Sequence, residues 1–268
     1  MAHLTPIQNR LFTLTQSKKA DVQEWFAMQT AKLEQPFYAS VDIRHSGMKI
    51  APVDTNLFPA GFNNLSADGK SRAVKSIRQF CEQHFPDAKN ILIIPENHTR
   101  NLNYLDNLHI LQTLFKDAGF ATTLGRIDLA FDAEENYLSA SGWPIVCHGI
   151  SRKENVLFAG SFKPDLIIVN NDFTSGVPDI LWDLEQPVRP CPGMGWYRRK
   201  KSEHFSAYQT LVREFGEAFG IDPWLIGSYF DQCGMVNFSE RKGLECVALA
   251  TGAGDLLLLL LDRKSTRL

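Results

Sequence analysis

Two short, continuously apolar runs constrain the fold of this chain more than any other feature. They are ILII at Ile91–Ile94 and LIIV at Leu166–Val169, and neither alternates with polar residues. Such runs are typical of parallel strands that are covered on both faces. A leucine-rich helical pattern, Leu102–Phe115, follows the first run, and a strand-like segment, Phe120–Ile127, comes next. This order predicts an α/β fold with a mostly parallel sheet flanked by helices.

Other periodic segments extend this fold. We expect helices over Ser17–Gln35, from Ser66 to about His84, and from a Ser202 cap to Gly220. Phe37–Ile43 alternates like a strand, and Trp143–Ala159 has the pattern of a hairpin. The predicted class is therefore α/β with a helical C-terminal third.

Polar clusters follow three of the predicted strands, after Ile43, Ile94 and Val169. In open α/β sheets, ligands bind outside the carboxyl ends of the strands. We therefore expect these three loops to converge on one crevice. The alternative is that their asparagine and aspartate side chains only cap turns and helix ends.

The first cluster, Asp42–Leu65, has too few apolar residues to form a strand or a helix core. Its glycines and prolines favour sharp turns, so we expect an ordered loop that either binds a polar ligand or caps its own turns. Its candidate binding residues are Arg44, Lys49, Asp54, Asn56, Asn63 and Asn64.

The other two clusters carry groups that suit an amino acid. Glu96 can accept an ammonium group while Arg100 binds a carboxylate, although neighbouring residues such as Thr99 and Asn101 are better read as helix caps. After Val169, an Asx turn is the alternative to ligand binding. The further candidates in these clusters are Asn97, Asn170, Asn171 and Asp172.

A basic run precedes the predicted helix at Ser202. Cations beside the free N–H groups of a helix N-terminus favour anions, so this run is a candidate carboxylate or phosphate site. A solvated basic loop is the alternative. The candidate residues are Arg198, Arg199, Lys200, Lys201 and His204.

Composition and motif content limit the partners and the kinds of site that we expect. A net charge of -2 and a pI near 6.4 give no general attraction to nucleic acid or to an anionic membrane, so we expect neither partner. The 5 cysteines lack CxxC spacing, so neither a disulfide framework nor a metal site is predicted, and we expect a cytoplasmic protein. No dinucleotide or P-loop fingerprint is present. The oligomeric state stays open.

Five ordered runs also resemble the glutamate-cysteine ligase (gamma-glutamylcysteine synthetase) family of the proteobacterial, ATP-grasp-like type. The resemblance covers about the first 250 residues. The runs are DIRHSGMKIAPVDTNLFPAGFNNL, PENHTRNLNYLDN, PDLIIVNNDFTSGVP, GWYRRKKSEHFSAY and FGIDPWLI.

The resemblance implies a pre-ATP-grasp-like N-terminal domain and a defined reaction. Members of the family join the γ-carboxylate of glutamate to the amino group of cysteine with ATP and Mg²⁺, which begins glutathione biosynthesis. Glutamate and cysteine are the implied substrates, with Arg44, Glu96 and Arg100 as the amino acid ligands. No catalytic residue is assigned.

Thr251–Leu268, with its six consecutive leucines, is unlike the family's Lys- and Gly-rich ATP-binding continuation. We expect a truncated, inactive chain with a substrate-binding domain over 1–185, a helical segment over 186–250 and a non-native tail over 251–268. The alternative is a self-standing α/β module that binds a small anionic metabolite.

Overall fold

A computed structural model describes residues 4–97, 101–195, 197–228 and 239–240. The chain divides into two compact units, each assembled from separate segments. One unit, here the sheet unit, comprises Ala20–Asp42 and Asp54–Arg199. The other, here the α5 unit, comprises Met1–Lys19, Ile43–Val53 and Lys200–Leu268. The contiguous division expected at residues 185 and 250 stays a prediction.

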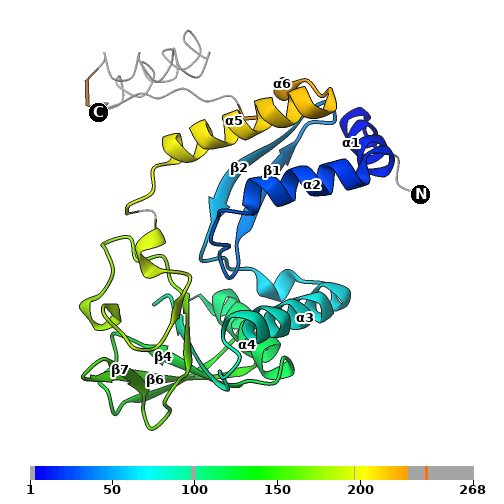
Figure 1. The fold of residues 1–268 in the computed structure, drawn as a ribbon. Helices are drawn as coiled ribbons and strands as arrows, with labels where there is room; N and C mark the ends of the chain where they lie inside the picture. The colour runs from blue at the N-terminus through cyan, green and yellow to red at the C-terminus, as the bar shows by residue number, and fades with distance from the viewer. Residues whose placement is uncertain (1–3, 98–100, 196, 229–238, 241–268) are drawn as a thin grey trace, which may run out of the picture. The chain divides into compact units, whose positions relative to one another are not determined.

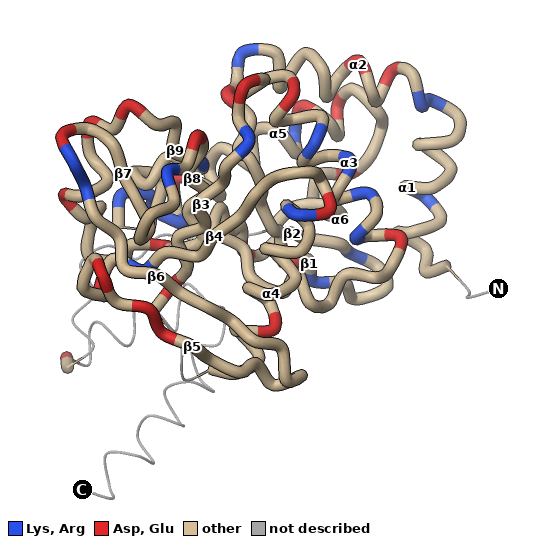
Figure 2. The backbone as a smooth tube through the Cα atoms, turned by 90° about the horizontal axis from the view of Figure 1, so that it is seen from below, with Lys and Arg blue, Asp and Glu red and all other residues tan. Residues whose placement is uncertain are grey.

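The sheet unit contains a seven-stranded sheet in the order β5-β6-β4-β3-β8-β9, with β7 paired to β6 (Figure 2). The β6–β4, β4–β3, β3–β8 and β8–β9 pairs are parallel, whereas β5 and β7 pair antiparallel with β6. The predicted, mostly parallel α/β sheet is therefore confirmed. The strands are β3 (Asn90–Pro95), β4 (Ala121–Arg126), β5 (Glu134–Leu138), β6 (Pro144–Lys153), β7 (Val156–Ala159), β8 (Leu166–Asn170) and β9 (Val188–Arg189).

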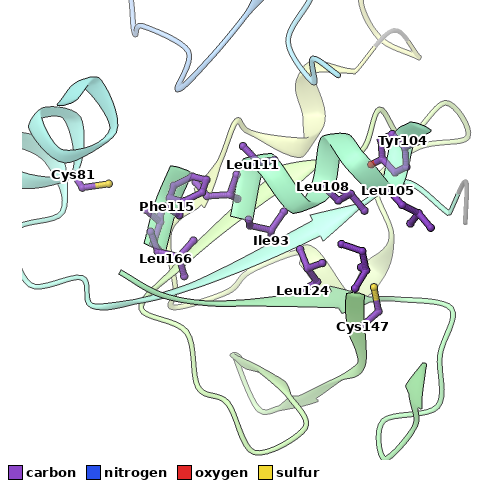
Figure 3. Close-up of a cluster of buried hydrophobic side chains, with 13 residues drawn as sticks. Cys81, Ile93, Tyr104, Leu105, Leu108, Leu111, Phe115, Leu124, Cys147 and Leu166 are labelled. Atoms are coloured by element: carbon purple, nitrogen blue, oxygen red, sulfur yellow. The ribbon is translucent and has the colours of Figure 1, made fainter. Parts of the chain in front are cut away.

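Helix α4 (Leu102–Asp117) covers one face of this sheet. Its residues Leu105, Leu108 and Leu111 pack with Ile93 and Leu124 in a single buried cluster (Figure 3). Helix α3 (Ala67–His84) lies alongside α4 (Figure 1). Ser66 caps α3 by accepting a hydrogen bond from Gly69 N, and Asn101 caps α4, as predicted.

The opposite face of β3 and β8 is covered by irregular segments and β7. Leu92 and Ile94 of β3 and Ile167 and Val169 of β8 are almost fully buried there. The side chains that cover them are Leu57, Phe58, Leu157 and Leu181, the last from the short helix η2 (Asp179–Leu181). Burial on both faces is what the two continuous apolar runs require.

The helix predicted over Ser17–Gln35 is confirmed in its central part only, and its predicted cap at Ser17 is wrong. The structure has α1 (Pro6–Ser17) and α2 (Lys19–Thr30), separated at Lys18. The first helix begins early because Gln8 accepts a hydrogen bond from Thr5 N at 2.9 Å, which supports the N-terminal turn. Ser17 ends a helix rather than starting one.

The prediction that Asp42–Leu65 is a loop without strands is also wrong. β1 (Ser40–His45) and β2 (Ile50–Asn56) form a separate two-stranded sheet. A turn joins them at Ser46–Lys49, where Gly47 has a positive φ of 87°. These strands depend on backbone pairing more than on burial. The segment therefore lacks the run of buried apolar residues by which a central strand is predicted.

The segment after residue 200 forms α5 (Lys201–Phe219) and α6 (Pro223–Ile226). Gly220 ends α5 in the left-handed conformation, as predicted. Ser202 does not cap this helix, because Lys200 occupies the N-cap position. Two further short helices are η1 (Phe62–Asn64) and η3 (Pro192–Met194).

Among the described residues, none of the helices is both long enough and apolar enough to cross a membrane. Basic and acidic positions are scattered along the described backbone rather than segregated by sign (Figure 2). Cys81, Cys147 and Cys191 are free thiols, whereas Cys233, Cys246 and the tail over 251–268 lie outside the described residues.

We expect Gly149→Ala to destabilise the sheet unit. An added Cβ at Gly149 would lie 1.7 Å from the carbonyl oxygen of Ala130, so the backbone would have to move. The expected loss is about 1–3 kcal/mol in the free energy of unfolding, measured by urea denaturation. In the control Gly193→Ala, the nearest atoms would stay 3.7 Å away. Equal stability of the two variants would contradict the expectation.

Candidate functional site

A cavity of about 470 Å³ lies at the carboxyl ends of β3, β4 and β8 in the sheet unit. Glu96 and Asn97 reach it from the end of β3, and Asp128 reaches it after β4. The segment after β8 supplies the longest part of its wall, which includes Asn171, Asp172, Phe173, Thr174, Ser175 and Gly176. Two of the three predicted polar clusters therefore meet in one cavity.

Parallel pairing brings these two clusters together. Ile94 lies opposite Val169, and Pro95 lies opposite Asn170, so both strands end at the same edge. Asn171 Nδ2 then donates a hydrogen bond to the carbonyl oxygen of Pro95 at 3.1 Å. The convergence is confirmed for these two loops. For the loop after Ile43, which belongs to another sheet and contributes none of the described lining residues, convergence stays a prediction.

Asn170 is buried behind the cavity, and its amide is used within the protein. Its Nδ2 donates to Pro59 O at 2.8 Å and to the Tyr38 hydroxyl at 3.3 Å, while its Oδ1 accepts from the Tyr104 hydroxyl at 3.3 Å. Burial raises the pKa of Tyr38 and of Tyr104 well above its usual value, so both hydroxyls keep their protons. Asn170 therefore supports the site rather than facing a ligand.

The backbone of Glu96 and the carboxylate of Asp128 are held in place by the structure around them. Glu96 N donates to the Tyr104 hydroxyl at 2.8 Å, which fixes the backbone at the end of β3. Asp128 accepts from Arg126 Nε at 2.9 Å, and Arg126 also contacts Glu135 at 3.3 Å. Burial acts to lower the pKa of the Arg126 guanidinium, but the two carboxylates outweigh it and raise that pKa.

Arg126 and Asp128 were missed in the sequence. Their only local signal is a charged pair, RID, at the end of a predicted strand. Glu135 reaches them from β5, an antiparallel edge strand that the sequence pattern did not predict. Only the folded sheet shows that a buried arginine orients a carboxylate of the cavity.

A cation lies next to the acidic wall. Arg199 is half-buried, and burial lowers its pKa, while the charges of Asp172 and Asp54 act in the opposite direction. The backbone of Gly195 lies against Asp172, since a Cβ there would be 2.6 Å from Asp172 Oδ1. The N–H groups of Arg198 and Arg199 donate to Gly195 O, which closes this turn. Three predicted residues, Asp54, Asp172 and Arg199, thus interact electrostatically.

Other predicted residues occupy different places. Asn56 accepts from Phe58 N at 2.8 Å and so forms a turn, while Asn63 and Asn64 are exposed in η1. Arg198 is exposed, and Arg100 lies outside the described residues, as do His98 and Thr99. The remaining candidates belong to the α5 unit and are Arg44, Lys49, Lys200, Lys201 and His204.

A metal ion would need several ligating side chains close together. The described residues contain no group of three or more histidine, cysteine, aspartate or glutamate side chains that could hold a metal ion.

The comparisons with known proteins decide the family. The family model for glutamate-cysteine ligase matches residues 13–264. The chain belongs to the glutamate-cysteine ligase family. The crystal structure of a protein from Methylobacillus flagellatus KT, named provisionally as a gamma-glutamylcysteine synthetase, is similar at 39% sequence identity with a TM-score of 0.84. No curated protein matches the chain.

The ligase-family match covers 99% of this chain and 62% of the Methylobacillus chain. The chain therefore spans less than two thirds of the length of this relative. The shared α/β fold extends over both units, so the cavity at the ends of β3 and β8 lies within the matched region of a ligase-family fold.

We expect Asn170→Leu to weaken the structure behind the cavity. The substitution leaves the buried carbonyl of Pro59 without its donor. The expected cost is about 1–3 kcal/mol in the free energy of unfolding, measured by urea denaturation. The matched control is Asn136→Leu on the exposed edge strand β5, where we expect a change within about 0.5 kcal/mol. A neutral Asn170→Leu would show that this hydrogen-bond network contributes little.

Proposed function

We propose that this chain takes part in the ATP-dependent ligation of the γ-carboxylate of L-glutamate to the amino group of L-cysteine. The product is γ-glutamylcysteine, and the reaction is the first step of glutathione biosynthesis. Membership of the glutamate-cysteine ligase family supports the reaction class. The observation that carries the proposal for this part of the chain is the carboxylate-lined cavity at the strand ends.

The cavity suits the amino acid end of glutamate. Glu96 and Asp172 offer carboxylates for an α-ammonium group, and the neighbouring Arg199 offers a guanidinium for an α-carboxylate. Charges of both signs that interact electrostatically match a zwitterion better than they match a purely anionic metabolite. The binding-module alternative is therefore not favoured, and the family match gives it no support.

ATP would supply the phosphoryl group that activates the γ-carboxylate as an acyl phosphate, and the cysteine amine would then displace phosphate. The residues of the cavity would bind and orient glutamate for that step. The described residues lack a metal-ligand cluster, so the proposal places no Mg²⁺ on them. Arg44 and Arg100 remain predicted ligands, and the cytoplasm remains the predicted location.

We expect Glu96→Gln to weaken L-glutamate binding. The substitution keeps the shape of the side chain but removes the charge that would pair with the α-ammonium group. A charge-assisted hydrogen bond contributes about 1.5–3 kcal/mol, so the dissociation constant should rise about 10- to 100-fold in calorimetric titration. Arg199→Met should weaken binding in the same way.

The controls are two exposed residues that pair with each other on α3. Asp68 and Arg72 form an ion pair at 2.6 Å. Asp68→Asn and Arg72→Met remove the same charges as the test variants, and we expect glutamate affinity close to that of the original chain. Unchanged affinity in a folded Glu96→Gln protein would overturn the assignment. Absence of glutamate binding by the original chain would overturn the proposed role of the cavity.

A further inference from the structure

A second, smaller cavity in the α5 unit combines cations with an exposed aromatic ring. It has a volume of about 140 Å³ and is lined by Lys49, Arg213, Gln209 and Trp224, among others. Lys49 comes from the turn between β1 and β2, whereas Gln209 and Arg213 come from α5. Two positive charges from distant parts of the sequence thus share one small space.

Neither cation is neutralised within the described part of the chain. Lys49 and Arg213 form no ion pair with a described carboxylate, whereas Lys200 on the same unit contacts Glu203 at 3.5 Å. The ammonium of Lys49 lies 4.6 Å from the centroid of the Trp224 ring. Two cations placed together repel each other, so an anion between them is the arrangement that would relieve this cost.

The ring and the cations are held by several packing contacts. Gly216 has no room for a side chain, because a Cβ would lie 2.5 Å from Ile221 O and 2.9 Å from Pro223 Cγ. Tyr208 Oη donates to Ile226 O at 3.0 Å, which ties the end of α6 to α5. Asp222 accepts from Trp224 N at 2.9 Å and caps α6. The wall that carries Trp224 is therefore fixed against α5.

The turn that carries Lys49 is held too. Ser46 N donates to Lys49 O at 3.0 Å, and Lys49 N donates to Ser46 Oγ at 3.2 Å. The Ser228 hydroxyl, at the other side of the cavity, donates to Pro52 O on β2. These contacts all lie within the α5 unit, so the cavity does not depend on the sheet unit for its walls.

We propose that Lys49 and Arg213 hold a phosphate group in this cavity, with Gln209 as a further donor and Trp224 as the apolar wall. The volume is far below the roughly 300–1,000 Å³ of pockets that enclose whole ligands, so the site takes one group rather than an entire molecule. The lysine supplies a point charge and the arginine a planar fork of donors, a pair that suits phosphate oxygens. This site is separate from the glutamate cavity.

The test is to measure the binding of inorganic phosphate to the chain and to its variants by calorimetric titration. Lys49→Met and Arg213→Met should each weaken phosphate binding about 10-fold, since each removes a charge-assisted contact. Lys49→Arg should retain most of the affinity because it keeps the charge. The matched controls, Lys75→Met and Arg72→Met, remove exposed cations of the sheet unit and should leave the affinity unchanged.

Trp224 provides a second readout. Phosphate should draw the Lys49 ammonium away from the indole and change its fluorescence, and Trp224→Phe should abolish that change. Tighter binding of ATP than of phosphate would assign the group to a nucleotide, whereas equal affinities would assign it to phosphate itself. The proposal is overturned if phosphate does not bind, or if Lys49→Met and Arg213→Met bind it as the original chain does. Glu96→Gln should leave phosphate binding intact, so this test is independent of the proposed glutamate site.

Discussion

Burial of β3 and β8 on both faces is the constraint on which the cavity at their carboxyl ends depends. Their central side chains have almost no solvent exposure, so the two strands must lie inside the sheet with cover on each side. Parallel pairing then places both carboxyl ends at one edge. Asn170 fixes the structure at that edge, because its buried amide joins β8 to Pro59 and to Tyr38 by hydrogen bonds. Apolar burial determines which segments form the central strands, and one polar network positions the loops that follow them.

The carboxylates of the cavity interact with two different arginines. Asp128 is oriented by a buried arginine that is itself shared with Glu135. Asp172 instead lies beside a half-buried arginine from a later loop, Arg199. The partly buried ion pair of Arg126 and Asp128 is costly to break by removing Asp128, because the remaining guanidinium has little water. The proposed zwitterion site uses charges of both signs, which a loop of solvated basic residues would not offer.

The parts of this fold that could be predicted from sequence are those with local or periodic signals. Continuous apolar runs predicted β3 and β8, and an asparagine cap predicted the start of α4. The strand predicted over Phe37–Ile43 overlaps the first half of β1, whereas β2 was not predicted because it lies in a segment read as a polar loop and its pairing is a backbone property. The predicted Glu96 and Asp172 do line one cavity, whereas Asp128 depends on nonlocal contacts with β5.

The near-neutral charge of the chain conceals two local environments of opposite sign. One cavity gathers carboxylates at the ends of buried strands, and the other gathers Lys49 and Arg213 around Trp224. The net charge of -2 is a sum over the whole chain, so it predicts neither site. Joining a carboxylate to an amine at the expense of a phosphoryl donor requires groups that bind ammonium and groups that bind anions. The proposed ligation would use both kinds of group, and the chain fixes each by local packing without any excess of overall charge.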